Sequence, residues 1–253
     1  MIQRVEQADW LSNAYLVVDE PGGHGVLIDS NGVTDPLTER VEREGIELTH
    51  LLLTHQHWDH VVGATELAER FGVPVVGSEE TKAAGGDQFE VTETVGGGDT
   101  IESGGLRIEA IEIPGHVAGQ LAFLIDGTDV ITADCLFKGT VGGTRAPAAT
   151  GFADQRTSIM DRLMDLPHET RVHPGHVGPT TIGDEWERNG FIRIWRGVDE
   201  EGADTCEVGP PDGERQEATL ILWAPDYDGG NKAWVRFADG EDTIVGGSQV
   251  KRS

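Results

Sequence analysis

A dense cluster of potential metal ligands follows an apolar run early in the chain. Directly after the leucines at 51–53, six residues contain His55, His57, Asp59 and His60. In an extended chain, residues two apart point to the same side, so His55, His57 and Asp59 can converge while His60 falls at the turn. Residues 61–71 then have helix spacing, with Gly72 as a stop signal. The pattern predicts a metal site between a strand end and a helix start, rather than a polar loop that happens to be rich in histidine.

The charge balance is strongly acidic. The 253-residue chain has 45 Asp and Glu against 19 Lys and Arg, which gives a formal net charge of -26. A molecule with this field repels polyanions, and the sequence has no cationic track that would follow the phosphates of a nucleic acid. We therefore expect a small-molecule substrate and no nucleic-acid partner. The acidic surplus is compatible both with a high-salt source and with ordinary acidic solubility.

The cysteines and the apolar segments bear on where the protein works. Cys135 and Cys206 are too few for a disulfide framework, and they lack the paired spacing of a structural zinc finger. Residues 1–7 lack the apolar core of a signal peptide, and no apolar run approaches the length of a membrane span. We expect a cytoplasmic protein with no membrane partner, and a chain long enough to bury a substantial core.

Strands and a helix are predicted before the cluster. Residues 15–18 and 25–29 are apolar runs separated by a turn that contains Pro-Gly-Gly, which predicts a hairpin. A helix is expected to begin with Thr34 as its cap and an early proline, and to end at Gly45. A buried strand at 48–53 then leads into the cluster.

Three later turns or strand ends also carry a ligand type. Residues 106–113 alternate with period two, as in a half-buried strand, and lead to His116 in a Pro-Gly-His turn. A predicted hairpin of 121–125 and 130–133 ends directly at Asp134. His176 lies in a second Pro-Gly-His turn. Potential ligands therefore recur where predicted strands end.

The sequence changes character near residue 194. Before it, a helix is expected at 154–166. Beyond it, acidic sequence rich in Gly and Pro leads to strand patterns, which lie at 219–223, 233–237 and 243–245. We predict two domains, 1–194 and a small β-rich C-terminal appendage at 195–253. The alternative is that two or three strands simply pack on the main body.

Four motifs together resemble the metallo-β-lactamase superfamily. They are Thr-His-Gln-His-Trp-Asp-His at 54–60, Pro-Gly-His at 114–116, Thr-Ala-Asp-Cys-Leu-Phe at 132–137 and Pro-Gly-His at 174–176. The Leu-Phe pair and the Pro-Thr-Thr-Ile-Gly segment at 179–183 are most similar to the glyoxalase II, or hydroxyacylglutathione hydrolase, branch. The resemblance covers residues 1–194. It implies an α+β fold, a four-layer αβ/βα sandwich with two metals between the sheet edges.

The resemblance also implies which residues hold two divalent metal ions. Matched by position, His55, His57 and His116 hold the first metal, Asp59, His60 and His176 hold the second, and Asp134 bridges them. Imidazole and carboxylate ligands suit zinc, which is expected first, and also iron or manganese. Asp59 and Asp134 are the expected catalytic residues. A hydroxide that bridges the metals would attack a thioester or a similar activated acyl compound, and Asp59 would orient it.

The C-terminal segment bears on the thiol of such a thioester. Glyoxalase II has a helical C-terminal region that helps to hold glutathione, whereas this tail has strand patterns, so the expected thiol is not restricted to glutathione. Gly-Gly-Thr-Arg at 142–145 stands where the branch tends to carry Gly-Arg-Thr-Asp.

The remaining histidines are assigned structural or solvated roles. They are His24, His50 and His168. His173 is an alternative to His176, which the motif favours. Cys135 follows Asp134 and should point away from the site as a buried small hydrophobe.

Three tryptophans have two interpretations each. Trp58 either walls the site or fills the core. Trp223 and Trp234 either form a ligand platform on the appendage or pack within it.

Three other functions remain as alternatives to hydrolysis of a thioester. The first is a persulfide dioxygenase with a single iron held by His55, His116 and Asp134. The second is a lactonase or β-lactamase-like hydrolase. The third is a metal-containing binding or scaffold protein, which the open ligand set disfavours because structural zinc sites are closed and four-coordinate.

Overall fold

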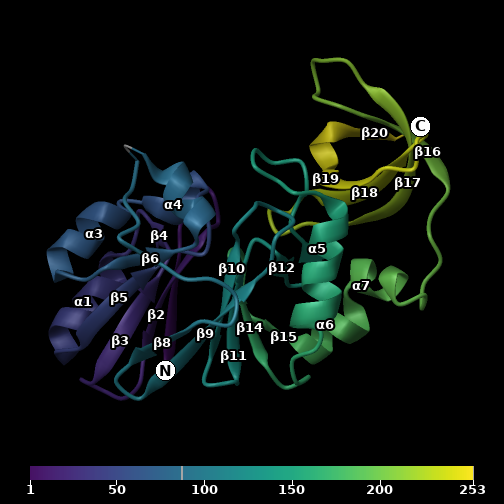
Figure 1. The fold of residues 1–253 in the computed structure, drawn as a ribbon. Helices are drawn as coiled ribbons and strands as arrows, with labels where there is room; N and C mark the ends of the chain where they lie inside the picture. Colours follow the sequence, from purple (N-terminus) through teal and green to yellow (C-terminus); the bar gives the residue numbers. More distant parts are fainter. Residues whose placement is uncertain (87, 253) are drawn as a thin grey trace. The chain divides into compact units, whose positions relative to one another are not determined.

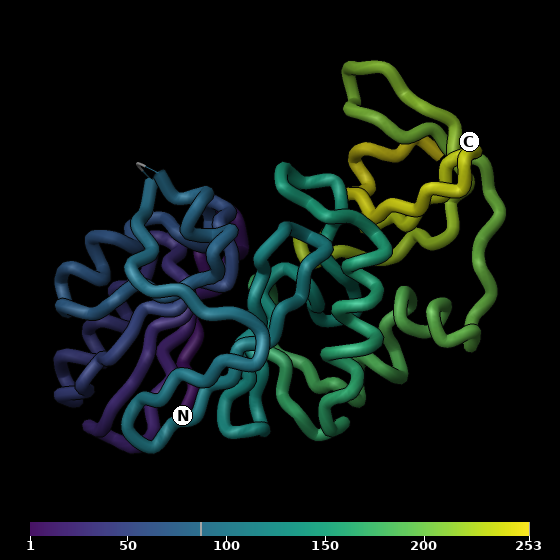
Figure 2. Tube along the Cα trace, viewed as in Figure 1, coloured from purple at the N-terminus to yellow at the C-terminus, as the bar shows by residue number. Residues whose placement is uncertain are grey.

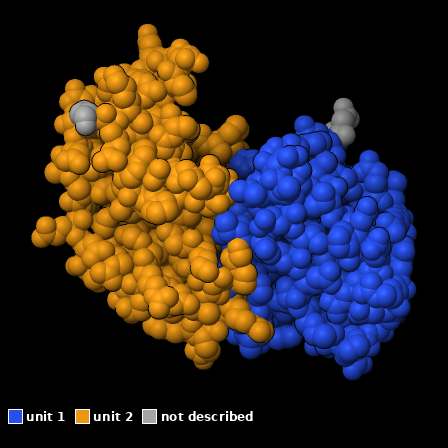
Figure 3. Space-filling model, turned by 180° about the vertical axis from the view of Figure 1, so that it is seen from behind, with its two compact units in different colours: residues 1–112, 119–133, 172–177 blue, residues 113–118, 134–171, 178–253 orange. Residues whose placement is uncertain are grey.

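The computed structural model describes residues 1–86 and 88–252. The chain forms two compact units (Figure 3). Unit 1 comprises residues 1–112, 119–133 and 172–177, and unit 2 comprises residues 113–118, 134–171 and 178–253. Among the described residues, no helix is long and apolar enough to cross a membrane.

Unit 1 contains two sheets with helices (Figure 1). The strands of its first sheet have the order β1-β2-β3-β5-β6-β7. Their bounds are β1 Ile2–Glu6, β2 Asn13–Val18, β3 His24–Ile28, β5 Glu47–Leu52, β6 Val75–Gly77 and β7 Glu93–Thr94. The strands of the second sheet that belong to unit 1 have the order β14-β11-β10-β9-β8. Its bounds are β8 Thr100–Ser103, β9 Leu106–Glu112, β10 Leu121–Ile125, β11 Asp129–Ala133 and β14 Arg171–Pro174. The other elements are β4 Ser30–Asn31, α1 Asp35–Glu44, α2 Trp58–Val61, α3 Ala64–Phe71 and α4 Glu79–Gly85.

The first sheet of unit 1 is covered on both faces. Strand β2 is buried along its whole length. Leu16 belongs to a hydrophobic cluster that contains Leu37 of α1, whereas its neighbour Val17 belongs to a cluster that contains Phe123 of the second sheet. A strand with a helix layer on one side and a sheet on the other needs apolar residues at nearly every position. The expected mixed α and β fold with several sheets is confirmed.

Parallel pairing in this sheet brings two strand ends to one edge. β3 pairs in parallel with β5, and β5 pairs in parallel with β6. Because the carboxyl ends of parallel strands lie at the same edge of a sheet, Asp29 after β3 meets the residues after β5. The backbone N–H of Thr54 donates to Oδ1 of Asp29 at 2.8 Å. This edge carries the histidine cluster.

Two predictions for the N-terminal elements are confirmed in outline. β2 and β3 pair antiparallel, as the hairpin pattern indicates. α1 has a proline in its first turn and ends at Gly45, whose φ of 66° is left-handed. The expected cap is wrong, because Thr34 lies in a helical conformation and its side chain makes no capping hydrogen bond.

The predicted single helix at 61–71 is wrong. Gly63, with a φ of 74°, separates α2 from α3. The extended segment ends at His57, and one helical turn already begins at Trp58. His60, expected in a turn, therefore lies within α2, and Gly72 ends α3 in the left-handed conformation as predicted.

Unit 2 combines short helices with a C-terminal sheet. Its first elements are β12 Leu136–Phe137, β13 Thr140–Val141, α5 Phe152–Ser158, the π-helix η1 Ile159–Leu163, β15 Thr180–Thr181, α6 Ile182–Arg188 and α7 Gly190–Trp195. The helix expected at 154–166 is thus an α-helix followed by a π-helical turn. Figure 2 follows the later strands of this unit in green to yellow.

The C-terminal sheet is larger than the sequence indicates. Its order is β19-β18-β17-β16-β20, and every pairing is antiparallel. The bounds are β16 Asp204–Val208, β17 Gln216–Pro225, β18 Asn231–Phe237, β19 Asp242–Gly246, the 3-10 helix η2 Gly247–Gln249 and β20 Val250–Arg252. β16 and β20 were not predicted, because each has few apolar residues of its own; β16 pairs with β17, and β20 pairs with β16. Cys206, Val208 and Val250 belong to the buried cluster of this sheet.

A buried carboxylate in unit 2 is expected to make stability depend on pH. Burial raises the pKa of Glu185, although Asn189, Thr180 and the backbone N–H of Gly139 donate to its oxygens and oppose the rise. A raised pKa in the folded state stabilises the protein below the unfolded pKa, and this contribution is lost as pH rises through the folded pKa. The Glu185→Gln variant should therefore gain stability relative to wild type as pH rises.

Urea unfolding of both proteins at fixed ionic strength across acidic to neutral pH measures this difference. Glu187→Gln, an exposed position on the same helix, is the matched control and should show no comparable trend. A relative loss of stability of Glu185→Gln with rising pH would contradict the assignment.

Candidate metal centre

Two groups of potential metal ligands occur among the described residues. One consists of His55, His57, His116 and Asp134, and the other consists of Asp59, His60 and His176. In the second group, one ligand atom from each residue lies within 4.8 Å of the others. All seven residues singled out in the sequence are members of these groups.

Asp29 fixes the imidazole of His60. It follows β3 with a φ of 60° and is 1% exposed. Oδ2 of Asp29 lies 3.0 Å from Nδ1 of His60. Because an ionised carboxylate only accepts hydrogen bonds, His60 carries its proton on Nδ1 and turns Nε2 towards Asp59 and His176. Burial raises the pKa of Asp29, while the hydrogen bonds from His60 and Thr54 oppose this rise.

Thr54 extends the same network to His55. Its hydroxyl donates to Oδ2 of Asp29 at 2.8 Å, and its oxygen lies 3.0 Å from Nδ1 of His55. With the hydroxyl proton committed to Asp29, the oxygen accepts from Nδ1–H of His55. Nε2 of His55 is therefore the nitrogen with a lone pair for a metal. One buried carboxylate thus sets the tautomers of two histidines.

His176 is held by the N-terminal strands of unit 1. The residue forms a β-bridge with Ser12, and the backbone N–H of Asn13 donates to the Gly175 carbonyl at 2.7 Å. The Asn13 amide and the Tyr15 hydroxyl both donate to the Pro174 carbonyl, at 2.9 and 2.6 Å. These bonds hold the turn that carries His176 without using its ring.

The ligand residues of unit 2 are held by other parts of that unit. Nδ1 of His116 lies 2.8 Å from the Gly143 carbonyl, so it donates a proton and leaves the Nε2 lone pair available. The Gln155 side chain is fully buried. It accepts from the His116 backbone N–H and donates to the Cys135 carbonyl, both at 2.9 Å. Gln155 therefore ties together the segments that carry His116 and Asp134.

The atom separations fit shared metal ions better than ion pairs. Oδ2 of Asp59 lies 3.6 Å from Nε2 of both His60 and His176, and Oδ2 of Asp134 lies 3.5 Å from Nε2 of His116. These distances are long for hydrogen bonds. Two ligand atoms that each lie about 2.1 Å from one ion in tetrahedral geometry are separated by about 3.4 Å. In His55, His60 and His116, Nδ1 donates to an acceptor, so Nε2 is the ring nitrogen suited to bind a divalent metal.

Strand alternation alone gave a wrong partner for Asp59. The alternation predicted that Asp59 would converge with His55 and His57. The helical turn at Trp58 ends that alternation, and Asp59 instead lies with His60 and His176. His57 is the residue before α2, and its ring centroid lies 4.8 Å from that of His55.

The other histidines belong to neither group. His173 lies 2.8 Å from Asp129 through Nε2 and Oδ1, and its ring packs edge-on against Tyr15. His50 lies within β5, and burial lowers its pKa. His24 is next to Asp19 and Glu47. His168 is exposed.

Two residues of the centre were missed by the sequence analysis. Asp29 ends a predicted strand, and the recurrence of ligand types at strand ends could have drawn attention to it. Gln155 lies in a helix with no local pattern that distinguishes it from a surface residue. Its role depends on contacts with residues 39 and 20 positions away along the chain.

The buried cysteines should be unreactive in the native protein. Cys135 and Cys206 are free thiols with no exposed surface, and burial raises the pKa of both. A chromogenic aromatic disulfide reagent should label neither thiol in native protein and both in denaturant. Rapid labelling of Cys135 before unfolding would contradict its assignment as a buried small hydrophobe.

The tryptophans separate into exposed and packed side chains. Trp58 is 51% exposed, so the prediction that it fills the core is wrong. Trp234 is 3% exposed and contacts Phe152 and Trp195, which is the packing interpretation. The guanidinium of Arg252 lies 5.2 Å from the ring centroid of Trp223.

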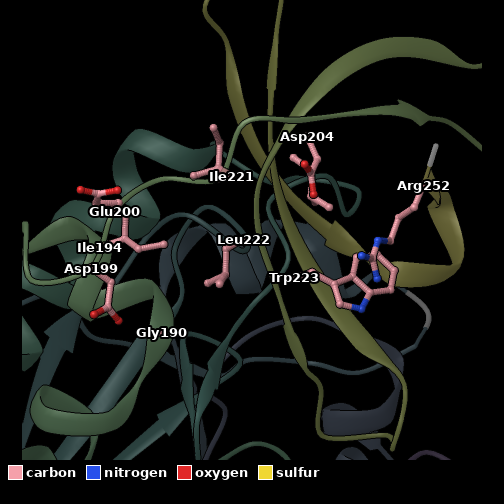
Figure 4. A pocket seen from close by; sticks show the side chains of 11 residues that line it. Gly190, Ile194, Asp199, Glu200, Asp204, Ile221, Leu222, Trp223 and Arg252 are labelled. Atoms are coloured by element: carbon pink, nitrogen blue, oxygen red, sulfur yellow. The ribbon is translucent and has the colours of Figure 1, made fainter.

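Trp223 and Arg252 also line a pocket in unit 2 (Figure 4). The pocket has a volume of about 290 Å³. Leu222 contributes an apolar surface, and the acidic residues of the lining are Asp199, Glu200 and Asp204. None of the seven ligand residues lines it.

Comparison with known proteins identifies the family. A sequence model of the Metallo-beta-lactamase superfamily matches residues 8–176. Hydroxyacylglutathione hydrolase from Rhizobium meliloti (strain 1021) is 38% identical over 144 residues, which are 56% of this chain and 53% of the relative. The chain thus spans about half the length of that protein. Hydroxyacylglutathione hydrolase GloC from Haemophilus influenzae is 30% identical over 202 residues, 71% of this chain and 92% of the relative.

A solved structure is similar in both sequence and fold. The crystal structure of TTHA1623 in a di-iron-bound form has a TM-score of 0.64 and 31% sequence identity, and the match covers 75% of this chain and 99% of that one. The chain therefore belongs to the metallo-beta-lactamase superfamily, as an enzyme whose curated relatives include hydroxyacylglutathione hydrolases.

Proposed function

We propose that this enzyme hydrolyses a thioester or a similarly activated acyl compound with two divalent metal ions. The observation that carries the proposal is the geometry of the potential ligands. Carboxylate oxygens lie 3.5 to 3.6 Å from Nε2 atoms of histidines, and the Nδ1 atoms of His60 and His116 donate hydrogen bonds to other acceptors. The names of the curated relatives support the reaction class. The di-iron form of TTHA1623 supports two metals rather than one.

In the proposed centre each residue has a definite part. His55, His57 and His116 would hold one ion and Asp59, His60 and His176 would hold the other, with Asp134 as a further carboxylate ligand. The donor set of imidazoles and carboxylates suits zinc first, with iron or manganese as alternatives. Asp29, Thr54 and Gly143 fix the tautomers, so that each histidine they contact presents Nε2.

The reaction needs water, a polarised carbonyl and a leaving thiolate. Paired divalent ions lower the pKa of a bound water towards about 7 and polarise an acyl oxygen. Asp59 is partly accessible, with 22% of its side chain exposed, and its carboxylate accepts a hydrogen bond that orients the attacking water. A new C–O bond forms, the C–S bond breaks, and the products are a carboxylic acid and a thiolate, which takes up a proton from solvent to become the thiol.

The chain's composition bears on the partners and the compartment. A net charge of -26 disfavours a nucleic-acid substrate, so the proposed substrate is a small molecule. Two buried cysteines that are not joined in a disulfide are consistent with work in the cytoplasm.

Metal content and two activities, measured on the same preparation, test the proposal. We expect two metals per chain, release of thiol from S-acetyl-N-acetylcysteamine, and no persulfide-dependent oxygen uptake. Treatment with a chelator should lower hydrolysis by more than about 100-fold and lower the midpoint of thermal unfolding, and added metal should restore both. One iron per chain with oxygen uptake would overturn the proposal in favour of a persulfide dioxygenase.

Single substitutions make the same test residue by residue. His176→Ala should abolish hydrolysis and reduce the metal content. His168→Ala is the matched control, because His168 is exposed and belongs to neither ligand group. Equal loss of metal in both variants would show that the ligand assignment is wrong.

A further inference from the structure

We propose that Trp10 and Trp58 form an aromatic wall beside the metal centre that binds an uncharged apolar group of the substrate. This inference rests on the proposed function and specifies its substrate class. The wall is defined as the two indole rings and consists of residues of unit 1 alone.

The two rings form an exposed apolar pair. Trp10 is 46% exposed and Trp58 is 51% exposed. Their ring centroids lie 6.3 Å apart with an interplanar angle of 76°, which is the edge-to-face contact that aromatic pairs favour. Single exposed apolar side chains are ordinary on protein surfaces. Two contacting indoles that both remain open to solvent indicate a surface that binds an apolar group.

Both rings are attached to segments that carry metal ligands. Trp58 begins α2 and stands between the ligands His57 and Asp59. Trp10 precedes Ser12 by two positions, and Ser12 is paired with the ligand His176 in a β-bridge. The wall is therefore connected from two sides to the group of Asp59, His60 and His176.

The loop that presents Trp10 is ordered by its own hydrogen bonds. Oε1 of Gln7 accepts from the backbone N–H groups of Asp9 and Trp10 at 2.6 and 2.8 Å. The Gln7 backbone N–H donates to Ser12, and its carbonyl accepts from Leu11 at 2.7 Å. Leu11 has a φ of 60°, which an L side chain rarely adopts. The loop therefore holds Trp10 in place before a ligand binds, and this lowers the entropic cost of binding.

The chemistry of the wall selects an uncharged apolar group. Indole faces bind apolar and aromatic groups through area burial and dispersion. They also attract cations, so a cationic substrate group is the competing occupant. An anionic group is disfavoured, because Asp9 adjoins Trp10 and Asp59 adjoins Trp58 in a chain with a net charge of -26. The apolar group can lie on the acyl side or on the thiol side of the thioester.

Two substrate series distinguish the acyl side from the thiol side. The first lengthens the acyl group from acetyl to hexanoyl on N-acetylcysteamine, and the second replaces the thiol of an acetyl thioester by hexanethiol. A third arm carries a trimethylammonium group at the end of the acyl chain. In wild type, kcat/KM should rise about twofold per added methylene in one of the two apolar series, because an open wall covers only one side of the substrate's alkyl group.

The variants assign the effect to the wall. The double variant Trp10→Ala with Trp58→Ala should lose the rise, mainly through KM, by about tenfold for the longest substrate. Trp58→Phe should retain most of the rise. Trp223→Ala, a tryptophan of the C-terminal sheet, is the control and should behave as wild type. A flat series in wild type, or a preference for the trimethylammonium substrate, would overturn the inference.

A binding measurement separates this inference from the proposed function. S-Hexyl-N-acetylcysteamine is a thioether without the acyl carbon that the proposed reaction attacks, and its binding is followed by quenching of tryptophan fluorescence. If the protein hydrolyses no thioester but binds this thioether in a way that Trp10→Ala weakens at least fivefold, the wall stands and the proposed reaction fails. If hydrolysis occurs and binding is unchanged in Trp10→Ala and Trp58→Ala, the wall fails alone.

Discussion

Replacement of Asp29 by asparagine is expected to lower the affinity for divalent metal by about 10- to 100-fold, the usual cost of losing an outer hydrogen-bond partner of a metal ligand. An asparagine can still accept the Thr54 N–H through its carbonyl oxygen. Its NH2 group then faces Nδ1 of His60, which lies 3.0 Å from Oδ2 of Asp29 in wild type. The ring responds by moving its proton to Nε2, the atom proposed to bind the metal.

The Asp29→Asn effect should exceed that of its matched partner. Thr54→Val removes the hydroxyl that links Asp29 to His55 but leaves the Asp29 contact with His60 intact. We therefore expect Thr54→Val to weaken metal binding less than Asp29→Asn. Competition with a chromophoric chelator gives both affinities, and chemical unfolding without metal shows whether either variant is folded. Wild-type metal affinity in a folded Asp29→Asn protein would refute the tautomer argument.

Replacement of Gln155 by leucine is expected to destabilise unit 2 and loosen its ligand residues. The change leaves the His116 N–H buried without its acceptor, whereas the Cys135 carbonyl loses one of two hydrogen bonds and keeps the one from the Gly142 N–H. An unsatisfied buried N–H costs about 1 to 3 kcal/mol and the lost hydrogen bond to Cys135 about 1 kcal/mol, so the free energy of unfolding should fall by about 2 to 4 kcal/mol. Gly115 packs closely against Gln155, because a Cβ built on Gly115 would clash with both the side chain and the backbone of Gln155.

Two further variants separate positioning from general stability. Ser158→Ala, on the same helix, removes one hydrogen bond to the Pro114 carbonyl at 2.7 Å and should cost about 1 kcal/mol. Gln155→Glu keeps the acceptor for the His116 N–H but replaces the donor to the Cys135 carbonyl by a buried carboxylate oxygen, so it should be less stable than wild type. The decisive readout is the increase in unfolding midpoint on metal addition. This increase should be smaller in the two Gln155 variants than in wild type, and it should be unchanged in Ser158→Ala. An unchanged increase in the Gln155 variants would mean that Gln155 stabilises the fold without positioning the metal ligands.

The sequence by itself determined the local features of this protein. Spacing, strand-end context and the family motifs singled out seven residues that recur in the two groups of potential ligands, and their assignment as metal ligands stays a prediction. Apolar runs and turn residues gave the β2–β3 hairpin, and Gly45 and Gly72 gave the ends of their helices. These signals are available because they depend on residues close together in the chain.

Local patterns failed where two short-range preferences competed. The apolar spacing at 61–71 predicted one helix and gave no sign of the break at Gly63. The predicted strand alternation included Asp59, although the extended segment ends at His57. β16 and β20 have weak patterns of their own and are defined by their pairing with neighbours. The prediction of separate domains at 1–194 and 195–253 depends on contacts of this kind and stays a prediction.

Only the tertiary structure decided how the ligands are supported. Asp29 reaches Thr54 and His60 because β3 and β5 are parallel neighbours, and Gln155 reaches His116 across 39 positions. Ser12, two positions after Trp10, pairs with His176 in a β-bridge across more than 160 positions of the chain. Hydrogen bonds over such separations follow from strand order and register, which are set by burial of the whole core and leave no periodic trace in the chain.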